Sequence, residues 1–169
     1  MEKFVRFNDK LQELAGTTAS VLSLILVLLV SADVAGRYLF NTGSVAAQEL
    51  EWHIFAVIFL LAAGYTMKHD EHVKVDVLYT KFSPKRKLMT NIFGTIFMLF
   101  PFCLFIIYYS IDFFLASVSM HETSPDPGGL PARYLLKLMI PIGFTLLLLQ
   151  GVSFLYNTIQ EYKKLKESL

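Results

Sequence analysis

The chain has 169 residues, of which 54% are apolar, and its mean hydropathy is +0.52. This apolar content exceeds what a soluble core of this size needs, so the composition indicates a membrane protein. Fifteen Lys and Arg residues oppose 14 Asp and Glu residues for a net charge of +1, which excludes the polycationic character of a nucleic-acid-binding protein.

Four apolar stretches are long enough to cross a bilayer, whose hydrocarbon core of about 30 Å needs roughly 20 helical residues. They lie at about residues 15–38, 46–67, 88–114 and 133–157. Cys103, inside the third stretch, is the single cysteine of the sequence, so an intramolecular disulfide is excluded. The connections are too short for another domain, so the sequence predicts an all-α membrane protein with one four-helix domain over residues 1–169.

Lys and Arg gather before the first span, between the second and third spans, and after the fourth. Because cationic connections stay on the cytoplasmic side, we expect both termini to be cytoplasmic. Val30 and Ala32 also fit the pattern before a signal-peptide cleavage site, but the long N-terminal region of mixed charge favours an uncleaved first span.

Charged residues close the first span and open the second, both on the predicted outer side. Asp33 and Arg37 are four residues apart in the order that favours an ion pair on one helix face. Glu49 and His53 have the same spacing, whereas Glu51 points roughly 200° away from Glu49, so the two glutamates cannot form one acid–base dyad.

These residues have a structural and a functional interpretation. Acidic residues near a helix N-terminus are favoured by the helix dipole, Ser44 fits an N-cap, and Trp52 fits an interfacial anchor. Alternatively, Glu49 and His53, with the charged pair at the end of the first span, face another protein chain. Clustering on one side of two adjacent spans motivates this second interpretation.

The predicted inner connection contains His69 and His72 beside three carboxylates, at Asp70, Glu71 and Asp76. This spacing could bind a metal ion, but one short segment would have to supply every ligand. The alternation of apolar and polar residues favours a segment lying along the membrane surface, followed by a basic anchor for anionic headgroups.

The last outer connection is rich in Pro and Gly and is expected to form a compact cover before the fourth span. Arg133 and Lys137 then stand one turn apart, where cations oppose the helix dipole. Glu122 or Asp126, a lipid phosphate or an acidic partner is expected to compensate them.

Prolines and small residues inside the third and fourth spans mark kinks or close packing, at Pro101, Pro141 and Gly143. Gln150, deep in the fourth span, is expected to hydrogen-bond to a neighbouring helix of this chain or of a partner.

Three short motifs, in this order and spacing, resemble the small membrane subunit of tripartite ATP-independent periplasmic (TRAP) transporters. They are RYLF at 37–40, QELEW at 48–52 and HVKVD at 72–76. The resemblance extends over the four-span layout and nearly the whole chain.

The resemblance implies a non-enzymatic subunit, without cofactor, metal or catalytic residue, in the bacterial inner membrane. Its partners would be membrane lipids, a large membrane subunit that holds the sodium and substrate sites, and a periplasmic protein that delivers an organic acid. The positions that match the family are Arg37, Glu49 and Glu51, with His72 and Asp76 as the inner-loop motif, and they are expected to serve assembly or docking. Asp33, His53, Arg133 and Lys137 join them as interface candidates because of their charge and position alone.

Two other classes stay open from the residues themselves. A stand-alone small transporter would need an intramembrane coupling group, for which Glu49 is the candidate. A membrane redox subunit would need paired axial histidines within spans, whereas His53 alone is placed inside one.

Overall fold

The structure is a computed structural model that describes residues 1–69 and 82–167. Its helices are α1 (Glu2–Phe40), α2 (Val45–Lys68), α4 (Pro84–Gly94), a π-helical turn η1 (Thr95–Leu99), α5 (Phe100–Ser119) and α6 (Tyr134–Glu167). Within the described residues, α1, α2, the continuous rod from α4 to α5, and α6 are each long and apolar enough to span a membrane. The predicted all-α, four-span class is therefore confirmed.

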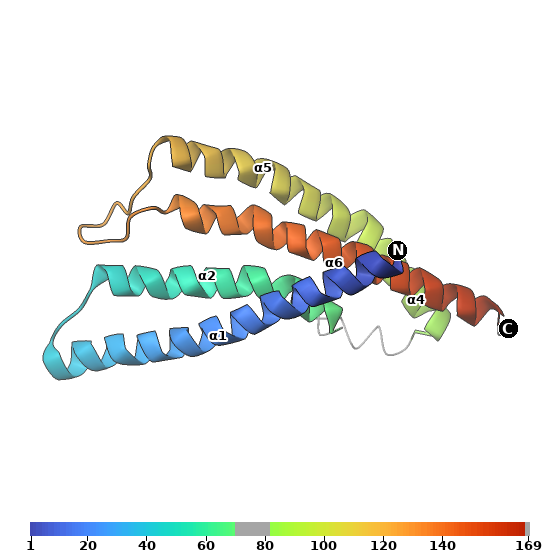
Figure 1. Cartoon of the computed structure of the whole chain (residues 1–169), viewed down its shortest axis with the longest axis horizontal. Helices are drawn as coiled ribbons and strands as arrows, with labels where there is room; N and C mark the ends of the chain where they lie inside the picture. Colours follow the sequence, from blue (N-terminus) through green and yellow to red (C-terminus); the bar gives the residue numbers. More distant parts are fainter. Residues whose placement is uncertain (70–81, 168–169) are drawn as a thin grey trace.

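The spans lie in a row rather than a closed bundle (Figure 1). α2 packs on α1 and α6, and α6 packs on α5, so that α1 and α5 occupy the two edges. Near the N-terminus α1 also crosses and contacts α6. α6 is more central than α1, because 28% of the residues in its most apolar 18-residue window are buried, against 6% in the corresponding window of α1. The edge helices consequently expose long apolar faces.

The two ends of the row differ in what they carry. Connections 41–44 and 120–133 share one end, called the outer end after the predicted orientation, and both chain termini share the opposite, inner end (Figure 1). α1 begins 13 residues before the predicted first span, and at 39 residues it measures about 58 Å, nearly twice the hydrocarbon core. Its first turns therefore extend well beyond the predicted span.

Local sequence explains where the first two helices end and begin. α1 ends at Asn41, which adopts a left-handed conformation with φ of 50°, a geometry that asparagine tolerates. The Ser44 side chain accepts a hydrogen bond from the Ala47 N–H at 3.3 Å, so the predicted N-cap of α2 is confirmed.

The predicted irregularity at Pro101 takes the form of the π-turn η1, which ends two residues before it and contains the residue four positions earlier. Proline lacks the N–H that would bond to the carbonyl four residues earlier, and its ring would collide with that carbonyl. A widened turn at this point relieves both conflicts.

Candidate functional site

Glu49 ties the outer connection to α2. Its side chain comes from the first turns of α2 and is only 4% exposed. The Ser124 hydroxyl donates to Oε1 at 2.5 Å, and the Leu130 N–H donates to Oε2 at 2.6 Å. A Cβ on Gly129 would lie 2.3 Å from Ser124 Oγ and 2.8 Å from Glu49 Oε2, so only glycine allows the connection to close over this carboxylate. Both carboxylate oxygens are therefore engaged in ordering the connection.

Glu122, inside the connection, ties α5 to α6. It accepts hydrogen bonds from the ammonium of Lys137 and from the buried hydroxyl of Ser117, the latter at 2.6 Å. The Lys137 hydrogen bond, followed by that of Ser117, holds the pKa of the Glu122 carboxyl below its usual value. Glu122 was one of the candidates predicted to compensate the cations of the fourth span, and it compensates Lys137.

Arg133 finds its compensation elsewhere. Its guanidinium lies over the Trp52 ring, 5.4 Å from the ring centroid, in a cation–π contact between the connection and α2. Its backbone N–H also donates to the carbonyl of Glu122 at 3.0 Å. Trp52 therefore does more than anchor α2 at the interface.

Asp33 and Arg37 form the predicted ion pair on α1, with Nη2 and Oδ2 separated by 2.5 Å. The Asp33 side chain is 4% exposed and that of Arg37 is 43% exposed, so the pair presents its cation outward. Among the described residues, no hydrogen bond or ion pair joins this pair to Glu49 or His53. The outer polar residues thus form two groups, one on α1 and one around the connection.

His53 and Glu51 do not bond to the Glu49 carboxylate. His53 Nδ1 lies 2.6 Å from the backbone carbonyl of Glu49, and because a carbonyl only accepts, Nδ1 carries the proton. The imidazole also packs on the neighbouring Trp52, with ring centroids 3.9 Å apart. Glu51 Oε1 is buried and accepts no hydrogen bond from any described residue.

A second polar group, the inner junction, joins α1 to α6. It consists of Asn8, Gln12, Gln150 and Ser153, all 4% exposed or less. Asn8 Nδ2 donates to Gln150 Oε1 at 2.7 Å and to Ser153 Oγ at 2.9 Å, and Gln12 Nε2 donates to the Leu146 carbonyl at 2.9 Å. The interhelical hydrogen bond predicted for Gln150 is confirmed, and its partner lies in this chain.

The sequence prediction missed Asn8 and Gln12 because they precede the apolar run that defines the first span. A signal for them is nevertheless present. The buried positions of α1 are Asn8, Gln12, Ala15, Gly16 and Ala19. Their spacing of three and four residues traces one helix face of small and amide side chains, which continues from the apolar run toward the N-terminus.

The predicted inner-loop motif, His72 and Asp76, lies outside the described residues, as do Asp70 and Glu71 of the possible metal site. His69 is described, and its ring packs on Tyr65 with centroids 4.3 Å apart. Next to it, the Lys68 ammonium donates to Glu13 at 2.7 Å and links the end of α2 to α1.

The four long apolar helices of the described residues indicate an integral membrane protein. The contacts above show that its polar side chains join the helices to one another and order the outer connection. A family model described as "Tripartite ATP-independent periplasmic transporters, DctQ component" matches residues 26–161. The match covers most of the chain, which therefore belongs to this family of small TRAP transporter components. The resemblance drawn from the three motifs is thereby confirmed, while a comparison with curated proteins gives no significant match.

Proposed function

We propose that the chain is the non-catalytic small membrane subunit of a sodium-driven, binding-protein-dependent transporter of organic acids. In this role it packs on the large membrane subunit, stabilises it, and contributes to the surface on which the periplasmic binding protein docks. It lies in a bacterial inner membrane with both termini in the cytoplasm, as the distribution of Lys and Arg predicts.

The ordered outer connection is the observation that carries this proposal. Glu49, Glu122 and Arg133 connect it to α2, α5 and α6, so a segment that spans only 120–133 is held against three helix ends. A docking surface benefits from such preorganisation, because a connection already ordered loses less conformational entropy when a partner binds.

The open row of helices supports the role of an accessory subunit. The edge helices leave large apolar side chains exposed, including Leu24, Leu28, Phe97 and Phe105. In a membrane such faces contact either lipid or another membrane protein. A larger partner could pack on the exposed apolar face of an edge helix without any rearrangement of the four spans.

The alternative of a stand-alone transporter with Glu49 as the coupling carboxylate receives no support from the geometry. Both Glu49 oxygens accept hydrogen bonds from the outer connection, and the side chain is almost completely buried. A coupling group has to exchange its ion or proton during transport, whereas this carboxylate is committed to holding a connection.

The test is reconstitution. Proteoliposomes that contain the large membrane subunit, with and without this chain, are compared for sodium-driven uptake of organic acids in the presence of the binding protein. We expect uptake only when both membrane subunits are present. Equal uptake by the large subunit alone, or uptake by this chain alone, would contradict the proposal.

Docking is tested separately with Arg133→Glu, which reverses a charge of the outer connection. Lys163→Glu is the matched control, because it reverses an exposed charge at the inner end. We expect Arg133→Glu to weaken binding of the periplasmic protein to the membrane complex and Lys163→Glu to leave it unchanged. An equal effect of both variants would argue against an outer docking surface.

A further inference from the structure

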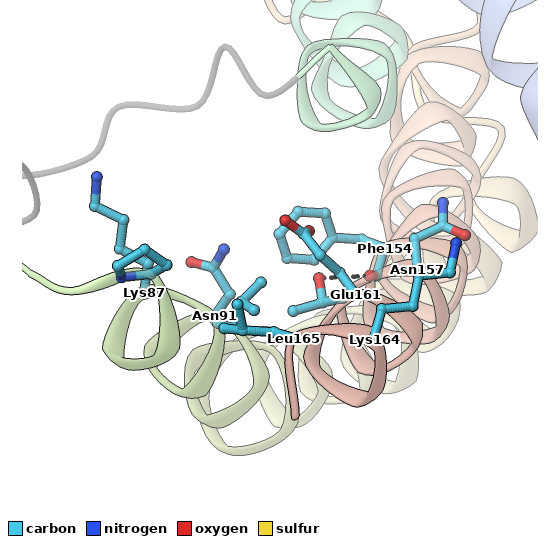
Figure 2. A pocket seen from close by; sticks show the side chains of 10 residues that line it. Lys87, Asn91, Phe154, Asn157, Glu161, Lys164 and Leu165 are labelled. Carbon is cyan, nitrogen blue, oxygen red and sulfur yellow. Dashed lines mark hydrogen bonds between the residues drawn. The ribbon is translucent and has the colours of Figure 1, made fainter. Parts of the chain in front are cut away.

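At the inner end, polar side chains of α4 and α6 line an open groove of about 840 Å³ (Figure 2). Lys87 extends from α4 on one side, while Asn157 and Lys164 lie on α6 on the other side, so the two ammonium groups do not converge. The groove continues to Leu165, beyond residue 157, where the predicted fourth span ends. Charges in this position can be solvated by water and require nothing from another protein.

The outer half of α5, one of the two edge helices, differs from the inner end. Its buried positions are Cys103, Ser110 and Ser117, which stand seven residues apart and form the face that packs on α6. Tyr108 and Asp112 each stand two residues from Ser110, which corresponds to a rotation of about 200°. Both are exposed and point away from the rest of the chain.

Three polar groups on this exposed side of α5 lack partners among the described residues. The Asp112 carboxylate forms no hydrogen bond or ion pair with any of them, and neither the Tyr108 nor the Tyr109 hydroxyl forms a hydrogen bond with any of them. The two tyrosine rings lie 5.2 Å apart between centroids, and Tyr109 packs on Phe105 at 4.6 Å. Phe105, Tyr108, Tyr109 and Asp112 are called the α5 outward cluster.

The α5 outward cluster lies within the predicted third span, residues 88–114. Side chains lean toward the N-terminus of their helix. Because α5 begins toward the inner end (Figure 1), the cluster leans into the hydrocarbon and away from the outer water. Aspartate is too short to carry its charge back to the interface as lysine does. A carboxylate that faces lipid is costly, and carboxylates inside membranes therefore pair with another group.

The described outer end offers no cation to Asp112. It contains three Lys or Arg residues, at Arg37, Arg133 and Lys137. Each of them is engaged in an ion pair or a cation–π contact with another residue, as described above. A counter-ion for Asp112 therefore has to come from a neighbouring molecule.

The opposite edge, formed by α1, makes no such demand. Between residues 20 and 35 its large exposed side chains are all aliphatic, including Leu24 and Leu28. The hydroxyls of Ser23 and Ser31 donate to carbonyls of their own helix, and the Asp33 carboxylate is paired within α1. Lipid is a sufficient neighbour for such a face.

The exposed side chains of the α5 edge also have the composition of a protein interface, where aromatic residues and methionine are enriched. Seven large exposed side chains of η1 and α5 are of these types: Phe97, Met98, Phe102, Phe105, Tyr108, Tyr109 and Phe113. The two edges of the row are therefore not equivalent as surfaces for a partner.

We propose that the α5 edge packs on the large membrane subunit and that Asp112 pairs there with a Lys or Arg of that subunit. The hydroxyls of Tyr108 and Tyr109 bond to polar groups of the same surface, and the ring of Phe105 packs on its apolar part. The α1 edge faces lipid. This inference rests on the function proposed above and adds which edge and which carboxylate form the interface.

The edge is tested by photo-crosslinking of the full-length chain in native membranes. The photoreactive residue p-benzoylphenylalanine replaces Phe105 or Tyr108 on α5, or Leu24 or Leu28 on α1, one position at a time. Adducts are identified by mass spectrometry. We expect adducts with the large membrane subunit from the α5 positions and only lipid adducts from the α1 positions. The large subunit crosslinked from α1, or not crosslinked from α5, would overturn the assignment.

Co-purification of the wild-type complex separates this inference from the function on which it rests. If the large subunit co-purifies but crosslinks only through α1, the edge is wrong and the accessory role stands. If the large subunit does not co-purify with the wild-type chain, both proposals are contradicted.

The ion pair is tested by the amount of large subunit that co-purifies with variants of Asp112. We expect Asp112→Lys to lower this amount about tenfold, and Asp112→Glu, which keeps the charge, to stay within about twofold of wild type. The matched control is Asp126→Lys, which makes the same charge reversal at an exposed position of the outer connection. Equal amounts with Asp112→Lys and Asp126→Lys would overturn the ion pair.

Two further measurements separate a lost ion pair from a damaged fold. Cys103 is 0% exposed, so a thiol-reactive dye should leave it unlabelled in every folded variant. A Lys or Arg in the crosslinked peptide of the large subunit is then changed to Asp, and this change should restore co-purification with Asp112→Lys. A crosslinked peptide without Lys or Arg, or a charge exchange that fails to restore assembly, would contradict the pairing.

Discussion

Glu49 and Glu51 stand two residues apart and have different surroundings. On a regular helix two residues turn through about 200°, and this separation places one glutamate under the outer connection while the other accepts no hydrogen bond from a described residue. The sequence predicts the separation but not which glutamate orders the connection.

Replacing Glu49 by glutamine should loosen the outer connection. The Leu130 N–H can only donate and therefore takes the single amide oxygen, so the NH₂ group faces Ser124 and the hydroxyl must accept where it donated. Both hydrogen bonds also lose the charge of the carboxylate, which weakens them. We expect amide exchange of residues 122–131, measured by hydrogen exchange and mass spectrometry, to become on the order of tenfold faster.

Glu51→Gln is the matched control for Glu49→Gln, since it makes the same chemical change two residues away. It should leave the exchange of the connection unchanged. If both variants accelerate exchange equally, the connection is not held by the Glu49 carboxylate.

Glu122 should make the outer end sensitive to acid. Its folded pKa lies below the usual value near 4.5, because Lys137 and Ser117 stabilise the carboxylate. The stabilisation is therefore complete above that value, where folded and unfolded chains are both ionised, and is lost as the pH falls through the folded pKa.

The contribution of the ionised Glu122 carboxylate is measured by thermal unfolding between pH 7 and pH 3, followed by the fluorescence of Trp52, the single tryptophan. We expect Tm to fall below about pH 4.5 in the wild-type chain and to fall less steeply in Glu122→Gln. Identical pH profiles for the two proteins would show that Glu122 does not contribute.

At the scale of elements, α6 packs through small residues because lipid provides no hydrophobic gain when two membrane helices meet. Close approach and interhelical hydrogen bonds remain as the stabilising contributions. Gly143 and Ser153 provide them at different depths, Gly143 against Leu60 of α2 and Ser153 against Asn8 of α1. The predicted close packing at Gly143 is confirmed.

Gly143→Ala should separate α2 from α6. The added Cβ would lie 2.8 Å from the Cβ and 2.9 Å from the backbone oxygen of Leu60, and a backbone atom cannot move aside as a side chain can. We expect a loss of about 1–3 kcal/mol in the free energy of unfolding. A thiol-reactive dye measures it, because Cys103 is 0% exposed and becomes reactive only on unfolding.

Gly94→Ala is the control, because among the described residues no atom outside the neighbouring backbone lies within 4 Å of the position of its Cβ. Alanine favours helix there, so this variant should equal or exceed the wild-type stability by up to about 1 kcal/mol. Equal destabilisation by both substitutions would mean that the contact with Leu60 is not the cause.

At the scale of the whole molecule, the antiparallel row places both termini at one end and connections 41–44 and 120–133 at the other. Which end faces the cytoplasm follows from charge and not from the fold. The buried Cys103 makes this question accessible, since single cysteines added at exposed positions can be labelled against a silent background.

Asp126→Cys and Lys163→Cys place thiols at the outer and inner ends, both at exposed positions. With a membrane-impermeant maleimide applied to intact spheroplasts, we expect labelling of the first variant only, and labelling of both after the membrane is opened. The reverse pattern would invert the predicted orientation.

Features that depend on a short stretch of chain were predictable. Examples are the ion pair of Asp33 and Arg37, the Ser44 cap and the irregularity at Pro101, since each depends on residues within one or two helical turns. The sequence also predicted that Gln150 bonds to another helix, although it could not name Asn8 as the partner, 142 residues away.

The sequence by itself determined the number of spans and their helical state, because a chain in lipid must satisfy its backbone hydrogen bonds within each segment. Only the tertiary structure decided which parts of the chain are neighbours. It places α6 between α2 and α5, brings Ser124 and Leu130 to the Glu49 carboxylate, and forms the groove beside Phe154. The physical reason is that lipid is as apolar as the helices it surrounds. Hydrophobic periodicity therefore does not reveal which faces meet, and the choice depends on close packing and polar contacts between residues far apart in the chain.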